Sequence, residues 1–158
     1  MKDYNYSDIM VDIYEYSPFM SVKREEANKF YVEEALKSGG RVLEFGTATG
    51  LLTLPLARAG LNVDSVDVSH DMHRFVEERL KHETEEVANR INLIISDMCT
   101  YENKDLEYDT VIIADNVLLA AGSLENQIRT LKNAKRHLKK GGKILIDIFT
   151  PDLSVLNN

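Results

Sequence analysis

Short apolar runs alternate with longer stretches of helical period along most of the chain. The apolar runs are rich in Val, Ile and Leu and predict strands at 41–45, 62–68, 91–96, 109–114 and 143–149. Apolar residues at helical spacing predict helices at 22–38, 51–59, 70–88 and 124–140. Strands that alternate with helices form a parallel sheet with right-handed crossovers, so the pattern predicts a doubly wound α/β fold.

Capping residues mark the expected ends of these helices. Ser21, Ser69 and Ser123 each precede a predicted helix, and a serine hydroxyl accepts a hydrogen bond from first-turn N–H groups. The glycine pairs at 39–40 and 141–142 are expected to end two of the helices. The lysines and arginines before the second pair fall in the last helical turns, where cations complement the carbonyl dipole. We therefore interpret them as a solvated helix end rather than a binding patch.

Composition narrows the classes of function. The 158 residues, 44% of them hydrophobic, suffice for one globular domain, and we assign 1–158 to it. A net charge of −7 disfavours binding to a nucleic-acid backbone, and the polar N-terminus resembles neither a signal peptide nor a spanning helix. Cys99 is the single cysteine, which excludes an internal disulfide and favours a reducing compartment. We expect a cytoplasmic protein with a small-molecule substrate and with no nucleic-acid or membrane partner.

The residues that follow the strands carry the candidate chemistry, because ligands of doubly wound sheets bind beyond the carboxyl ends of the strands. Gly46 and Gly50 follow the first strand, and such a turn lets a ligand approach the main chain and the next helix. The dinucleotide fingerprint would also need glycine at Ala48 and Leu51, so NAD is disfavoured. Asp67 follows the second strand, where a carboxylate accepts hydrogen bonds from ribose hydroxyls.

Adenine-binding side chains are expected after the third strand and in the helix after the second. Asp97 can accept from an exocyclic amine, Met98 can face an adenine ring, and Met72 can cover its other face. His70 and His73 lie at the start of the same helix as Met72. Because no further ligand is evident near them, they indicate a solvated face, and no metal is expected.

Together these strand ends resemble the class I S-adenosylmethionine-dependent methyltransferases of the small-molecule type. The similar segments are "VLEFGTATG", "VDVSHDM", "SDM", "YDTVIIADNVLLA" and "LKKGGKILIDIFTP". The resemblance implies a Rossmann-like sheet in the order 3-2-1-4-5 within 41–150, preceded by a lid and a helix in 1–40. It also implies S-adenosylmethionine as the cofactor, S-adenosylhomocysteine as its product, and methyl transfer to a small-molecule acceptor.

Residue roles follow from the same resemblance. The implied cofactor contacts are Tyr14, Glu44, Gly46, Thr47, Gly50, Asp67, Val68, Met72, Asp97, Met98 and Ala114. Tyr14 is expected to cover the cofactor, and Glu44 to lie near its amino group. Asp115 and Asn116 are the candidate catalytic residues, with Asp115 acting either as a base or as a wall or turn residue.

Two departures from the family pattern bear on activity. Ala120 stands where related enzymes often have a histidine near the acceptor. The C-terminal antiparallel hairpin of the family is also missing, which would leave 143–149 as an apolar sheet edge. We therefore expect a homo-oligomer or a heteromeric partner to cover this strand and complete a split enzyme, unless the sequence is a fragment of a longer protein. The alternatives are a non-catalytic S-adenosylmethionine-binding regulatory or scaffolding subunit, and aminopropyl transfer from a decarboxylated cofactor.

Overall fold

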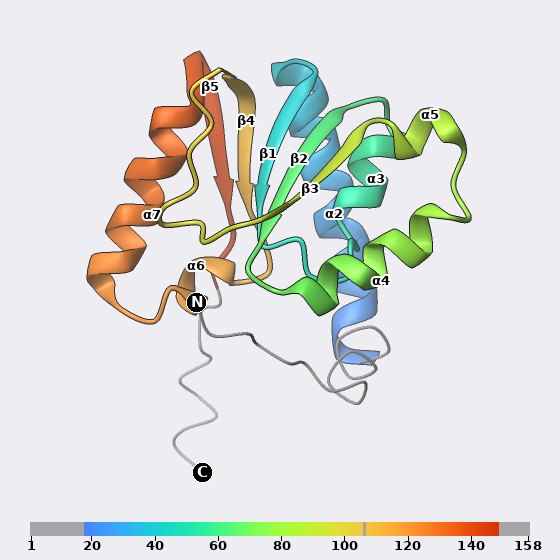
Figure 1. Ribbon diagram of the computed structural model, residues 1–158, viewed down its shortest axis with the longest axis horizontal. Helices are drawn as coiled ribbons and strands as arrows, with labels where there is room; N and C mark the ends of the chain where they lie inside the picture. Colours follow the sequence, from blue (N-terminus) through green and yellow to red (C-terminus); the bar gives the residue numbers. More distant parts are fainter. Residues whose placement is uncertain (1–17, 106, 149–158) are drawn as a thin grey trace.

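The computed structural model describes residues 18–105 and 107–148, and its centre is one parallel sheet (Figure 1). The strands are β1 (Arg41–Phe45), β2 (Asn62–Asp67), β3 (Ile91–Ile95), β4 (Tyr108–Ile113) and β5 (Leu138–Ile146). They pair in parallel in the order β3-β2-β1-β4-β5, which confirms the predicted doubly wound α/β sheet. The strand order reverses between β1 and β4, and the carboxyl ends of these two strands flank the position where ligands bind in such sheets.

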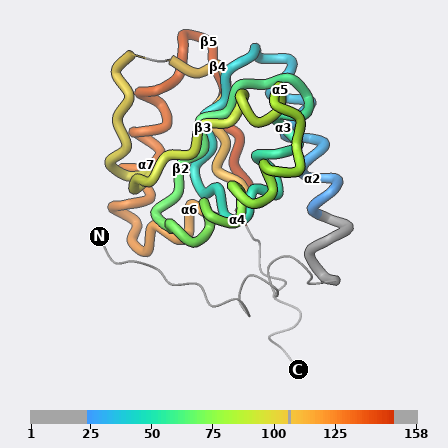
Figure 2. Tube along the Cα trace, turned by 45° about the vertical axis from the view of Figure 1, so that its right-hand side comes forward, coloured from blue at the N-terminus to red at the C-terminus, as the bar shows by residue number. Residues whose placement is uncertain are grey.

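Helices cover both faces of the sheet. They are α2 (Pro18–Ser38), α3 (Thr53–Arg58), α4 (His70–Leu80), α5 (Glu85–Ala88), α6 (Val117–Ala120) and α7 (Leu124–His137). Figure 2 shows α7 on one side of the sheet and α2 and α3 on the other, and in Figure 1 α2 begins at the edge where the strands end. None of these described helices combines the length and the apolar composition that crossing a bilayer requires.

Successive strand residues point to opposite faces, which divides the core into two clusters. The cluster on the α7 face contains Leu43, Phe45, Val66, Tyr101, Tyr108, Val111, Ile113, Leu118 and Ala134. The cluster on the α2–α3 face contains Tyr31, Ala35, Val42, Leu52, Leu56, Leu61, Val63 and Ile112. Burial on both faces explains the nearly continuous apolar sequence of the central strands. Glu44 lies between two residues of the first cluster, so its side chain points to the α2–α3 face.

The structure corrects the bounds of two predicted helices. The helix expected over 70–88 is divided into α4 and α5, because the chain turns after α4 and the Thr84 hydroxyl accepts from the N–H of Val87 to begin a new helix. α2 begins at Pro18, so the predicted cap Ser21 lies inside the helix. Proline is favoured in a first helical turn, where its missing N–H leaves no hydrogen bond unmade.

The predicted end of the last helix is also wrong, although the serine caps predicted for α4 and α7 are confirmed. α7 ends at His137, because Leu138 is extended and pairs with Tyr108 of β4. The glycine pair that was expected to end this helix therefore lies within β5. Gly141 has φ +86° there, beside a shift in the β4–β5 register.

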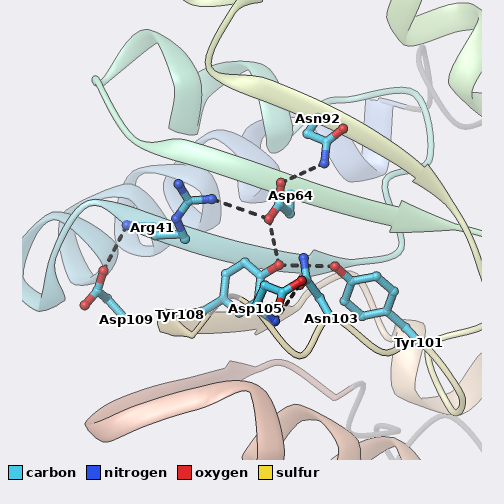
Figure 3. A network of polar contacts seen from close by, with 8 residues as sticks. All are labelled: Arg41, Asp64, Asn92, Tyr101, Asn103, Asp105, Tyr108 and Asp109. Atoms are coloured by element: carbon cyan, nitrogen blue, oxygen red, sulfur yellow. Dashed lines mark hydrogen bonds and ion pairs between the residues drawn. The ribbon is translucent and has the colours of Figure 1, made fainter.

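A buried carboxylate links four strands inside the sheet (Figure 3). Asp64 of β2 is 4% exposed and accepts hydrogen bonds from the Tyr108 hydroxyl of β4 (2.6 Å) and the Asn92 amide of β3 (3.0 Å). Arg41 of β1 lies 3.7 Å from the same carboxylate, and the Tyr101 hydroxyl lies 3.2 Å from that of Tyr108. A buried charge is costly unless it is paired, so these contacts explain how the core accommodates Asp64.

Candidate functional site

The ends of β1, β2 and β3 lie side by side at one edge of the sheet. The N–H of Gly46, directly after β1, donates to the carbonyl of Val66 in β2 over 2.8 Å. The N–H of Ser96, directly after β3, donates to the carbonyl of Asp67 over 3.0 Å. The glycine turn, Asp67 and the segment that begins at Ser96 are therefore neighbours, as a parallel sheet requires.

The carboxylate of Asp67 holds the glycine turn. Its Oδ2 accepts from the N–H of Ala48 (3.0 Å), and its Oδ1 accepts from the N–H of Ser69 (2.9 Å). Ala48 has φ +44°, a left-handed conformation that is uncommon for a residue with a Cβ, and the bond to Asp67 supports it. A carboxylate offers about four acceptor sites, so the half-buried Asp67 keeps about two for other donors.

Glycine is required at both predicted turn positions, and packing within the chain is one reason. Gly46 and Gly50 have φ values of +89° and +81°, which favour glycine. A Cβ on Gly46 would lie 2.5 Å from Cγ2 of Val117, and a Cβ on Gly50 would lie 3.0 Å from Cγ2 of Val76. The start of α6 and the middle of α4 therefore pack directly on the turn. This packing requires glycine in addition to the predicted need to admit a ligand.

A buried polar network lies beneath the turn and joins β1, β2, α3 and α4. Oε2 of Glu44, which is 2% exposed, accepts 2.6 Å hydrogen bonds from the hydroxyls of Thr53 and Ser65. The Thr47 hydroxyl lies 2.7 Å from that of Ser65 and 3.3 Å from Nε2 of His73. Burial raises the pKa of Glu44 to about 7, although its two hydroxyl donors favour the ionised form. His73 is 5% exposed, so the solvated face predicted for it is wrong, and burial lowers its pKa.

The end of β4 forms an unusual turn that is braced from β5 and α2. Asp115 and Asn116 have φ values of +53° and +62°, so two successive residues are left-handed before α6. Asp147, just after β5, accepts from the N–H of Asn116 and from the hydroxyl of Tyr31, each over 2.9 Å. Nε of Arg24, two helical turns before Tyr31 in α2, lies 4.0 Å from Oδ2 of Asp115.

Sequence reasoning missed Asp147 and Arg24. Asp147 obeys the rule that identified Asp67, because it directly follows a parallel strand. Arg24 is buried at 9% exposure and shares a helical face with Tyr31, a pattern visible in the sequence.

The three residues predicted to contact adenine also make contacts within the chain. Met72 of α4 is 5% exposed, and Met98 packs against the α7-face cluster. Oδ1 of Asp97 accepts from the N–H of Cys99 over 2.6 Å, and the carbonyl of Met98 accepts from the Asn133 amide over 2.8 Å. Burial raises the pKa of the Cys99 thiol, which favours the predicted structural role over a nucleophilic one. Contact with adenine stays a prediction for all three predicted residues.

Of four further positions singled out in the sequence, three lie within the described residues. Tyr14 lies outside the described residues. Val68 and Ala114 are half-buried, directly after β2 and β4 respectively. Ala120 is exposed at the end of α6, a short helix that the sequence analysis did not predict.

A groove of about 640 Å³ reaches Leu51, the residue that follows the glycine turn. It lies between α2 side chains within 24–33 and the residues Leu51 and Pro55. The amide of Asn28 donates to the carbonyl of Leu51 over 2.8 Å and ties the two walls together. Arg24 lies at this groove, but none of the cofactor residues predicted from the sequence lines it, so we do not assign the body of the cofactor to it.

Comparisons with known proteins agree with the geometry. The cypemycin N-terminal methyltransferase of a Streptomyces species is 31% identical over 114 residues, which are 72% of this chain and 43% of that protein. The CcbJ methyltransferase of Streptomyces caelestis superposes with a TM-score of 0.77 at 24% identity, over 87% of this chain and 54% of that chain. The glycopeptide N-methyltransferase MtfA, complexed with S-adenosyl-L-methionine, gives a TM-score of 0.69 at 25% identity, over 78% and 53%.

The family assignment rests on a match along most of the sheet. The chain spans about half the length of the curated relatives that it matches. A family model described as a methyltransferase domain matches residues 43–144, which is more than half of the chain. With its parallel sheet ordered 3-2-1-4-5, the chain belongs to the class I S-adenosylmethionine-dependent methyltransferase family.

Proposed function

We propose that this domain binds S-adenosylmethionine across the carboxyl edge of the sheet and supports methyl transfer to a small molecule. The observation that carries the proposal is the carboxylate of Asp67, which is bonded to the glycine turn through the N–H of Ala48. Its remaining acceptor sites match the two hydroxyls of a ribose. The glycine pattern, which disfavours NAD, supports the same choice of cofactor.

Polar side chains at the carboxyl edge of the sheet suit both the adenine end and the methionine end of S-adenosylmethionine. Asp97 can accept from the adenine amine at one end. The methionine end carries an ammonium and a carboxylate group. Glu44 and Asp115 suit the ammonium, while Arg24, buried beside Asp115, suits the carboxylate. Tyr14, which lies outside the described residues, is proposed as a lid.

Catalysis by this chain would be mainly positioning. The bound cofactor supplies a methyl group already activated by the positive charge of its sulfur. The protein then has to hold the acceptor against that group and exclude water, and such positioning supplies about 7–11 kcal/mol. Asp115 and Asn116 are proposed to line the acceptor side, and the Asp115 carboxylate takes up the proton of an acceptor that still carries one.

Amines are the first acceptors to test. The glycopeptide N-methyltransferase is named for methylation of nitrogen, and the cypemycin N-terminal methyltransferase is named for the N-terminus of its substrate. We propose that the acceptor of this chain is also an amine, and that it is a small molecule, as the family suggests.

The acceptor side of the site is proposed to need polypeptide beyond the described residues. β5 is an edge strand of the described sheet, and Ile146 and Ile148 at its end are 37% and 55% exposed. An apolar edge with unpaired main-chain groups favours the addition of another strand. We propose that a second copy or a different subunit docks on β5 and completes the enzyme. Light scattering after size-exclusion chromatography tests this; a strictly monomeric protein with full turnover would overturn it.

Calorimetric titration tests the cofactor. We expect S-adenosylmethionine and S-adenosylhomocysteine to bind and NAD not to bind. Asp67→Ala should weaken binding about tenfold or more, because it removes charge-assisted acceptors. Asp105→Ala, which removes an exposed carboxylate, is the matched control and should bind normally. Equal affinity of wild type and Asp67→Ala would remove Asp67 from the site.

A second assay separates catalysis from binding alone. Exposed Ala120 in α6 favours the alternative of a non-catalytic S-adenosylmethionine-binding subunit, since alanine offers no acid or base. Transfer of a labelled methyl group to a panel of small amines, with the protein in its native complex, would support the enzyme. Tight cofactor binding without transfer to any acceptor would support the alternative.

A further inference from the structure

In the buried network beneath the glycine turn, the chemistry of the groups decides which one donates and which one accepts in each hydrogen bond. An ionised carboxylate only accepts, and Oε2 of Glu44 accepts from the hydroxyl of Ser65 over 2.6 Å. Ser65 has one hydroxyl proton, so in its 2.7 Å contact with Thr47 it accepts. Thr47 then donates its own proton and must accept from His73, whose Nε2 lies 3.3 Å away. With Glu44 ionised, the network therefore requires the Nε2–H tautomer of His73.

The network anchors the turn from inside the protein. The Thr47 side chain is 2% exposed and points into the network, and the Thr47 carbonyl accepts from the N–H of Gly50 over 2.9 Å. Thr47 thus joins the main chain of the turn to the polar groups beneath it. His73 reaches Thr47 from α4, whereas Glu44 is linked to Thr47 through Ser65.

We infer that His73 is a positioning residue that fixes Thr47, and with it the main chain of 46–50, through its Nε2–H group. The inference rests on the proposed function in one respect, that this main chain carries the methionine end of S-adenosylmethionine. His73 acts through Thr47 and needs no contact with the cofactor. It is also distinct from the two carboxylates already proposed for the ammonium group.

Protonation of Glu44 on Oε2, the oxygen that contacts Ser65, permits the opposite direction of donation through the network. A protonated Glu44 donates to Ser65, Ser65 donates to Thr47, and Thr47 donates to Nε2 of His73, which must then be in the Nδ1–H tautomer. The charged groups that act on Glu44 are Asp67 at the end of β2 and Asp115 at the end of β4. The charged and titratable groups that act on His73 are Asp67, Glu77 and His70. Because the pKa of Glu44 is near 7, both network states are accessible around neutral pH.

Nitrogen-15 NMR of the histidine rings in the unliganded full chain reads the tautomer directly. We expect His73 to carry its proton on Nε2 at pH 8 and to shift toward Nδ1 at pH 6. In Glu44→Gln this pH dependence should vanish, since Gln does not titrate. An Nδ1–H tautomer at pH 8, or the same titration in Glu44→Gln, would overturn the inference. This measurement on the wild type needs no cofactor and no substitution of His73.

Cofactor affinity at pH 8 provides a second readout, with S-adenosylhomocysteine as the probe. His73→Leu should weaken binding about tenfold, the effect of one lost hydrogen bond. His73→Gln places an N–H near the position of Nε2 and should retain affinity within about threefold. His82→Leu, at an exposed histidine of the turn after α4, is the matched control. Equal loss in the Leu and Gln variants would assign His73 to packing alone. If the wild type fails to bind the probe, the proposed function fails, whereas the NMR result stands by itself.

Discussion

The hydroxyl of Tyr31 in α2 donates a 2.9 Å hydrogen bond to Asp147, just beyond β5. The other oxygen of Asp147 accepts from the N–H of Asn116, also over 2.9 Å. One carboxylate therefore connects an N-terminal helix, an edge strand and the left-handed turn after β4. Burial, the bond to Asp147 and the nearby carboxylate charges raise the pKa of Tyr31, so this tyrosine stays a donor throughout the physiological range.

Asp147→Ala should destabilise the protein by about 1–3 kcal/mol, because it leaves two donors without their acceptor. It should also relax the turn at Asn116, whose strained conformation costs about 1–3 kcal/mol per residue and is held by its surroundings. Urea unfolding measures the stability change. Tyr31→Phe is the control, since it removes one donor and leaves the bond to Asn116 intact. Equal effects of the two substitutions would show that the bond to Asn116 contributes nothing.

Gly46→Ala should cost about 2–5 kcal/mol of stability. The left-handed backbone at φ +89° accounts for about 1–2 kcal/mol, and overpacking against Val117 accounts for about 1–3 kcal/mol. Adding Val117→Ala should recover the steric part and leave the backbone part. A double-mutant cycle of unfolding free energies measures the coupling. Additive effects would mean that the turn moves away from α6 without cost.

The parallel sheet and the residues at the carboxyl ends of its strands could be predicted, because both follow from local patterns in the sequence. Strand alternation predicts a parallel sheet, and the sheet brings residues such as Asp67 to one edge. The end of α7 was not predictable in this way, because Leu138 leaves the helix to pair with Tyr108, thirty positions earlier in the chain. Asp147 was missed because the last strand was predicted to run to residue 149, which placed Asp147 inside the strand and not directly after its end. Its contact with Tyr31, 116 residues away, leaves no local signal either.

Tyr108→Phe should destabilise the protein by about 1–3 kcal/mol, because buried Asp64 loses its 2.6 Å donor. Burial and the bond to Asp64 raise the pKa of Tyr108, so the hydroxyl is protonated and donating at every working pH. Tyr101→Phe is the comparison, since its hydroxyl contacts only the neutral Tyr108 hydroxyl among the bonds drawn in Figure 3. It should cost less, about 0.5–1.5 kcal/mol. A smaller loss for Tyr108→Phe than for Tyr101→Phe in thermal or urea unfolding would contradict this account of the network.

The stability of the protein should depend on pH through Glu44. A glutamate titrates near 4.3 in an unfolded chain, whereas burial raises the pKa of Glu44 to about 7 in the folded protein. Between these values the folded state binds a proton that the unfolded state does not, so the stabilising contribution is full below about pH 4 and is lost as the pH rises through about 7.

The size of this effect follows from the shift in pKa. A difference of between two and three pKa units corresponds to about 3–4 kcal/mol over the whole interval between the two pKa values, of which at most about 3 kcal/mol falls between pH 5 and pH 8. Relative to Glu44→Gln, the wild type should therefore lose up to about 3 kcal/mol of unfolding free energy between pH 5 and pH 8. Urea unfolding at a series of pH values measures the difference, with Glu107→Gln at an exposed position as the control. If wild type and Glu44→Gln change in parallel across this range, Glu44 is already ionised at pH 5. Its carboxylate would then favour the cationic cofactor at every pH tested, and cofactor affinity would show no midpoint near 7.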